Sequence, residues 1–185
     1  MRFELETLES LAPEARVLAE RVLAVSSDGI GGPFNLLLKS PATGARIVDL
    51  LDHFNGGFST LDARLRRLAV LILARHAGAR YAWWAHRRRA LKSGEFTGAQ
   101  IDAINRRAVP EGLDTRLTAV QAYVQALTRG TPTPAPLLAA LQAALTEAEV
   151  VDLIVFCGTY TTVAMLLNEA DVALPAGEED TLNRD

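Results

Sequence analysis

The feature that most constrains the fold of this chain is residues 59–94, where two helical patterns are joined by His76-Ala77-Gly78-Ala79. Apolar residues recur in the first pattern at spacings of three and four, which predicts a helix with a buried face. They are Leu61, Leu65, Leu68, Ala69, Ile72 and Leu73. We expect Ser59 or Thr60 to cap this helix, because a side-chain oxygen accepts one of the unpaired backbone N–H groups. Gly78 stands where a helix end favours a residue that tolerates a positive φ.

The second pattern in this stretch holds both tryptophans of the chain, His86 and the basic run Arg87-Arg88-Arg89, and it ends at Gly94. No other stretch of similar length concentrates so many aromatic and ionisable groups. Candidate site residues are therefore sought here first.

The rest of the chain also has the patterns of helices, and Ala and Leu dominate its composition, which favours helices. Strand-like alternation and internal repeats are missing from the sequence. We therefore predict an all-α fold of roughly eight to ten helices. Apart from the central pair, the expected helices cover residues 13–25, 34–40, 41–55, 99–107, 114–129, 137–145 and 146–168. Thr146 and Glu149 match a capping box, and the apolar last helix is expected to be buried in the domain or in a subunit interface.

Charge and cysteine content exclude several classes of protein. The net charge of −3 argues against a nucleic-acid partner, because no basic excess is present to replace phosphate counterions. A single cysteine, Cys157, rules out an intramolecular disulfide, a CxxC pair and a cysteine zinc cluster. His53 and His76 stand alone, so we expect no metal site. We also expect a cytoplasmic protein without a membrane segment, because the N-terminus lacks a signal sequence and polar residues interrupt the apolar runs.

His86 is the first candidate for chemistry. A neutral histidine near pH 7 can act as a general acid or base, but it can equally be a structural residue that bonds a backbone carbonyl. Arg67 either faces solvent or points inward. An inward arginine needs an anion, and Asp49, Asp52, Asp62 or a substrate carboxylate could supply it.

The aromatic residues also allow two interpretations. Tyr81, Trp83 and Trp84 could line a pocket or belong to the core or an interface. Tyr160 and Asn168 lie in the apolar last helix and need hydrogen-bond partners if buried. Cys157 has no basic neighbour and should be an inert packing residue.

Four stretches carry a resemblance to a known family: FNLLLKSP, LRRLAVLILARHAGARYAWWAH, LKSG and VVDLIVFCGTYTTVAMLLNEADVALPAG. Together they resemble the carboxymuconolactone decarboxylase family, the structural relative of alkyl hydroperoxidase D. The similarity covers a family-like helical domain (32–177), which leaves an N-terminal helical extension (1–31) and an acidic tail (178–185). Composition predicts that the chain after Leu174 is disordered. The similarity also implies an alkyl hydroperoxidase D-like helical bundle that assembles as a homo-oligomer (dimer, trimer or hexamer) and uses no cofactor.

The departures from the family pattern bear on the reaction. The redox branch of the family carries CxxCxxxH, and its cysteines would fall on Ala79 and Ala82, so a thiol peroxidase cycle has no nucleophile. Other members carry glutamates at the positions of Ala82 and Arg67 and a histidine where Lys39 stands. The resemblance therefore implies a site that has changed from acidic to basic and retains His86.

From these residues we predict a decarboxylase, lyase or isomerase that acts without a cofactor on a small, anionic, carboxylated or enolisable substrate. His86 would be the catalytic proton carrier, with Tyr81 or Tyr160 assisting. Arg67, Lys39, Tyr81, Trp83 and Tyr160 would contact the substrate, the two basic groups stabilising its negative charge. The alternative is a non-catalytic helical oligomer that binds a small molecule or a partner protein.

Overall fold

The computed structural model describes residues 2–26 and 29–183, and within these ranges the chain forms nine α-helices and no strand. This confirms the predicted all-α class. The helices are α1 (Pro13–Val25), α2 (Pro33–Leu37), α3 (Pro41–Asn55), α4 (Ala63–Ala77), α5 (Arg80–Ser93), α6 (Gly98–Asn105), α7 (Thr115–Leu127), α8 (Ala135–Ala144) and α9 (Glu147–Glu169).

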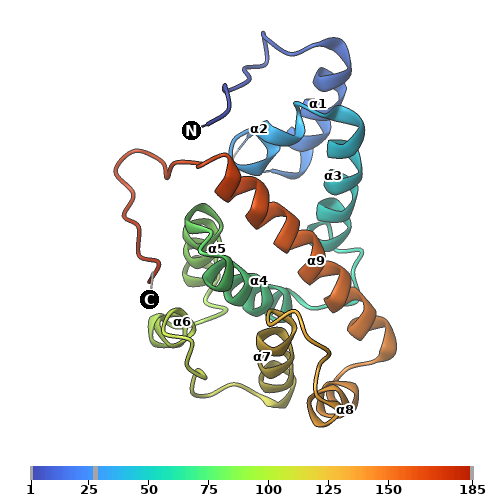
Figure 1. The fold of residues 1–185 in the computed structure, drawn as a ribbon, viewed down its shortest axis with the longest axis vertical. Helices are drawn as coiled ribbons and strands as arrows, with labels where there is room; N and C mark the ends of the chain where they lie inside the picture. The colour runs from blue at the N-terminus through green and yellow to red at the C-terminus, as the bar shows by residue number, and fades with distance from the viewer. Residues whose placement is uncertain (1, 27–28, 184–185) are drawn as a thin grey trace.

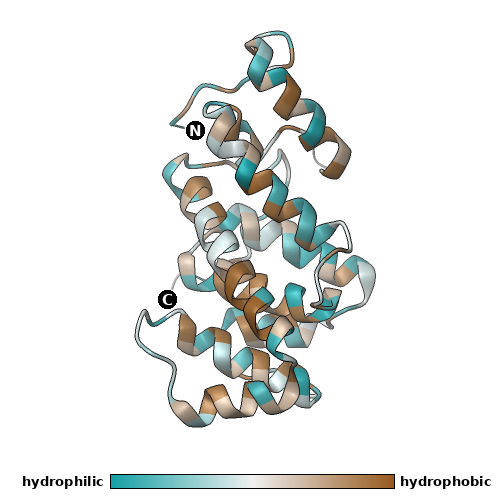
Figure 2. Ribbon diagram, turned by 90° about the vertical axis from the view of Figure 1, so that its right-hand side faces the viewer, coloured by the Kyte–Doolittle hydropathy of each residue, from teal (hydrophilic) through white to brown (hydrophobic). Residues whose placement is uncertain are grey.

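The helices form an elongated body in which α9 runs diagonally across the middle (Figure 1). α1, α2 and α3 lie at one end of the body, and α6, α7 and α8 lie at the other. Apolar and polar residues alternate along most helices, as expected for helices with one buried face (Figure 2). One large apolar core joins α3–α9, and a smaller one lies between α1, α2 and α3.

α4 is the central helix, because it packs against α5, α6, α7 and α9. Its residues from Leu68 to Arg75 are buried on every side. The predicted Ser59 or Thr60 cap is wrong: Asp62 caps α4, with Oδ1 accepting the Leu65 N–H at 2.9 Å. Ser59 and Thr60 donate their hydroxyl groups to Asp152 of α9 instead. The left-handed Gly78 (φ 62°) ends the helix as predicted.

α9 begins with the predicted capping box of Thr146 and Glu149. One side of the helix is buried against α4, and the other leaves Val151, Ile154, Val155 and Met165 exposed. Among the described residues, α9 alone has the length and hydropathy of a membrane-crossing helix, contrary to the expectation that polar residues interrupt every such run. Half of its most apolar stretch is buried in the protein.

The described part of the C-terminal segment is ordered against α5 and α6, so the predicted disorder is wrong there. Trp83 Nε1 donates to Thr181 Oγ1 at 3.2 Å, and Trp84 Nε1 donates to Glu178 at 2.8 Å. Leu182 is buried in the main core. These contacts are distant in sequence, so the acidic composition of the segment gave no sign of them.

Candidate functional site

A cavity of about 250 Å³ contains His86 in its wall. α5 contributes Tyr81, Ala82 and His86 to this wall, and α9 contributes Tyr160 and Val163. The remaining wall comes from α3, α4 and the N-terminal residues around the start of α2, among them Val25, Gly31 and Pro33. We call this space the His86 cavity.

The central contact of the His86 cavity is a hydrogen bond between Arg67 and His86. Arg67 Nη1 lies 2.7 Å from His86 Nδ1. A guanidinium can only donate hydrogen bonds, so Nδ1 is the acceptor and the imidazole carries its proton on Nε2. The pKa of His86 lies well below 6.5, because burial disfavours the imidazolium and the charges of Arg67 and Arg89 repel it. His86 is therefore neutral at pH 7 and can donate a hydrogen bond from Nε2.

Arg67 points inward, and Glu95 is its anion. Arg67 Nε donates to Glu95 Oε2 at 2.8 Å, and both side chains are mostly buried. Asp49, Asp52 and Asp62, the side-chain partners predicted from the sequence, do not fill this role. Glu95 follows the end of α5 and is brought to Arg67 by the packing of α5 on α4. Glu95 thus balances the charge of the guanidinium at its Nε edge. The remaining nitrogen of the guanidinium, Nη2, has no hydrogen-bond partner within the described ranges.

Tyr160 supplies a second polar group beside His86. The two rings meet edge to face, with centroids 5.4 Å apart. Asn55 Nδ2 donates to the Tyr160 hydroxyl oxygen at 3.4 Å. Burial raises the pKa of Tyr160 above 10.0, although Asn55 and the nearby arginines oppose this. The hydroxyl therefore keeps its proton at neutral pH and can donate it in a hydrogen bond.

His86, Tyr160, Arg67 and Asn55 also form part of a second hollow, of about 230 Å³. Arg66 lines this hollow, and its guanidinium donates to the Leu61 carbonyl. Burial lowers the pKa of Arg66. The polar groups around His86 thus lie between two spaces large enough for water or a small ligand.

The structure brings together four of the six predicted site residues: His86, Arg67, Tyr81 and Tyr160. Lys39 is not in the wall of the His86 cavity, because its Nζ pairs with Glu6 at 2.6 Å. Trp83 is not in the wall either, since it is buried in the core against the C-terminal segment.

Sequence reasoning missed Asn55, Arg89 and Glu95. Arg89 was visible as one member of a basic run, and its position three residues after His86 on α5 was the available signal. Asn55 was seen only as a helix end, and no local pattern pointed to either Asn55 or Glu95.

The geometry also bears on cysteine and metal chemistry. Cys157 is buried, and burial raises the pKa of its thiol to about 12, so the predicted inert packing role is confirmed. Between residues 2 and 26 and between 29 and 183, no three His, Cys, Asp or Glu side chains gather in a group that could hold a metal ion.

Compared with models of known protein families and with curated proteins, the chain matches none of them.

Proposed function

We propose that this chain is a carboxymuconolactone decarboxylase-like enzyme that binds a small carboxylated or enolisable anion in the His86 cavity without an organic cofactor. The observation that carries the proposal is the neutral, Nε2-protonated His86 next to Tyr160 and Arg67. Two uncharged donors and a guanidinium in an enclosed space are groups that stabilise a developing enolate. The sequence resemblance described above points to the same chemistry.

In this proposal Arg67 and Arg89 attract the carboxylate of the substrate into the cavity. The bond between carbon and carboxylate breaks, its electron pair moves onto the neighbouring carbonyl oxygen as an enolate, and carbon dioxide leaves. His86 Nε2–H and the Tyr160 hydroxyl donate hydrogen bonds to that oxygen, and carbon then takes a proton from water. A neutral imidazole serves better here than an imidazolium, because it polarises the oxygen without binding the carboxylate of the ground state.

This hydrogen-bonding role differs from the proton-carrier role predicted from the sequence, and two variants distinguish the two roles. Wild type, His86→Gln and His86→Ala are each given a carboxymuconolactone, and carbon dioxide release is followed. A glutamine donates a hydrogen bond but cannot take up or release a proton near neutral pH. We expect His86→Ala to lose at least about 100-fold in turnover, as for a lost oxyanion donor, and His86→Gln to lose much less. Full turnover by His86→Ala would contradict any catalytic role of His86.

A second candidate function is binding without turnover. It is favoured by the pairing of Arg67 with Glu95 and by the low pKa of His86, which leaves His86 unfit to take up a proton near pH 7. In that case small carboxylates would saturate the cavity, as measured by calorimetry, and none would be converted. Conversion of any bound carboxylate or enolisable ketone would eliminate this candidate.

We further propose that the protein works as a cytoplasmic homo-oligomer. The support is the exposed side of α9, where Val151, Val155 and Met165 are each more than 40% exposed. Their spacing of four and ten residues puts them on one face of the helix. Exposed apolar side chains gathered on one side of a helix are typical of an interface.

A further inference from the structure

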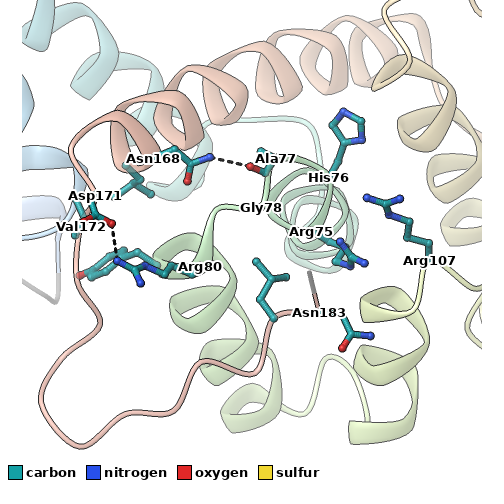
Figure 3. Close-up of a pocket in the computed structure, with 13 residues that line it drawn as sticks. Arg75, His76, Ala77, Gly78, Arg80, Arg107, Asn168, Asp171, Val172 and Asn183 are labelled. Carbon is teal, nitrogen blue, oxygen red and sulfur yellow. Dashed lines mark hydrogen bonds and ion pairs between the residues drawn. The ribbon is translucent and has the colours of Figure 1, made fainter. Parts of the chain in front are cut away.

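Another cavity, of about 490 Å³, neighbours the His86 cavity. Tyr81 and Leu167 line both cavities. The larger cavity is bounded by the C-terminal ends of α4 and α9, the first turn of α5 and the C-terminal segment (Figure 3). Its volume is in the range of cavities that hold small organic ligands. We call it the arginine cavity.

The arginine cavity has an excess of positive charge. Among the described residues, Arg75, His76, Arg80 and Arg107 line it, against one carboxylate, that of Asp171. Asp171 already pairs with Arg80 at 2.7 Å. An adjoining hollow of about 250 Å³ shares Arg75, His76 and Arg107 and adds Arg129. This concentration of basic groups stands out in a chain whose net charge is −3.

Arg107 has a left-handed backbone conformation at the end of α6, where its N–H donates to the Ile104 carbonyl and the Ala108 N–H donates to the Ala103 carbonyl, both at 2.9 Å. Arg107 directly follows the C-cap of α6 and has a φ of 58°, in the left-handed region where a glycine is favoured. An arginine here is strained, because a Cβ is crowded in this region. In Figure 3 the Arg107 side chain extends from the end of α6 toward α4, the helix that carries Arg75 and His76.

We propose that the arginine cavity binds a small organic phosphate. Guanidinium groups match phosphate oxygens in geometry, and several of them around one space favour a ligand with more than one negative charge. A monocarboxylate offers too little charge for this set of groups. The site is separate from the proposed chemistry at His86 and does not depend on it.

The competing explanation is that the basic residues serve the fold. α4, α6 and α9 end near this cavity, and cations stabilise the C-terminal ends of helices. Arg75 fits this explanation, because its Nε donates to the Asn105 carbonyl at the end of α6 at 2.6 Å. Arg107 separates the two explanations, since replacing it by glycine relieves its left-handed strain while removing its charge.

The test measures binding of pyrophosphate to the full chain by calorimetry at low ionic strength. It compares wild type, Arg107→Gly and Arg106→Ala, a neighbouring exposed arginine outside the cavity. We expect saturable binding by wild type and Arg106→Ala. Binding by Arg107→Gly should be about tenfold weaker, as for a lost hydrogen bond to a charged group, while its Tm stays the same or rises.

Three results would overturn the proposal: no saturable binding by wild type, equal binding by Arg107→Gly, or equally tight binding of citrate, which would remove the preference for phosphate. A fall in the Tm of Arg107→Gly without a change in binding would establish the structural explanation. His86→Ala should bind pyrophosphate as wild type does, so failure of the proposed enzyme activity and failure of this site are told apart.

Discussion

Arg67 donates a hydrogen bond to Nδ1 of His86 across 2.7 Å, and this single contact fixes which nitrogen of the imidazole carries the proton. The contact joins α4 to α5. Arg67 also bonds Glu95, which lies just after the end of α5. The site is thus built on two rigid helices, and its charge depends on a residue outside both.

Glu95→Gln should destabilise the protein, because it leaves the largely buried Arg67 without its anion. We expect a loss of about 1–3 kcal/mol in the free energy of unfolding, measured with urea. Glu111→Gln is the matched control, since Glu111 is exposed and only its backbone carbonyl accepts a hydrogen bond, from Gln100. Equal stability of the two variants would contradict an essential Arg67–Glu95 pair.

His86 should make the protein less stable in mild acid. Its pKa is lower in the folded state than the ordinary 6.5, so below pH 6.5 the unfolded chain binds more protons. The neutral, buried His86 makes its full contribution to the free energy of unfolding above pH 6.5. That free energy then falls as the pH drops toward the folded-state pKa, by at most about 1.4 kcal/mol per pH unit. Urea unfolding between pH 5 and 8 should show this loss in wild type and in His76→Gln, which removes an exposed histidine. A wild-type slope that persists in His86→Gln would assign it to another group.

Gly32→Ala should disturb the His86 cavity. Gly32 has a φ of 60°, and a Cβ there would lie 2.8 Å from the Tyr81 ring, which lines the cavity. Gly29 is the matched control, because it has a φ of 68° and open space around its Cβ position. Gly29→Ala should lose about 1 kcal/mol from backbone strain alone, and Gly32→Ala about 1–3 kcal/mol more. Similar losses in urea unfolding would mean that Tyr81 moves aside freely.

Thr181→Val tests whether the C-terminal segment is held by the hydrogen bond from Trp83 to Thr181. The substitution keeps the shape of the side chain but leaves the buried Trp83 N–H without its acceptor. We expect a loss of about 1–3 kcal/mol in unfolding free energy and a change in tryptophan emission. Thr162→Val, on the exposed side of α9, should have little effect on either. An unchanged emission spectrum in Thr181→Val would argue that the segment does not contact Trp83.

Val155→Lys should weaken the proposed assembly through α9. Val155 is 41% exposed, so a lysine can reach solvent in a monomer but would be buried unpaired in an apolar interface. Analytical ultracentrifugation should show an oligomer for wild type and for Val109→Lys, an exposed site away from α9. Val155→Lys should sediment as a smaller species. A wild type that is monomeric at all concentrations would refute the assembly.

Local patterns predicted most of the helices. The prediction for residues 13–25 agrees with α1 to the residue, and the Thr146–Glu149 capping box marks the start of α9. The residues that form such a signal lie within about one helical turn of one another, so the sequence alone is enough to recognise it. The cap of α4 was misplaced because Ser59 and Thr60 are good caps by type, while Asp152, far along the chain, takes their hydroxyl groups.

The sequence by itself determined the all-helical class, the capping box at the start of α9, the end of α4 at Gly78, and His86 and Arg67 as candidate site residues. Periodicity and residue chemistry are local properties, so they can be recognised without knowing which residues pack together in space. Only the tertiary structure decided that Glu95 neutralises Arg67, that Lys39 pairs with Glu6 and that Trp83 holds the C-terminal segment. Each of these contacts joins residues 28 to 98 positions apart, and packing between elements, which no local pattern encodes, brings them together.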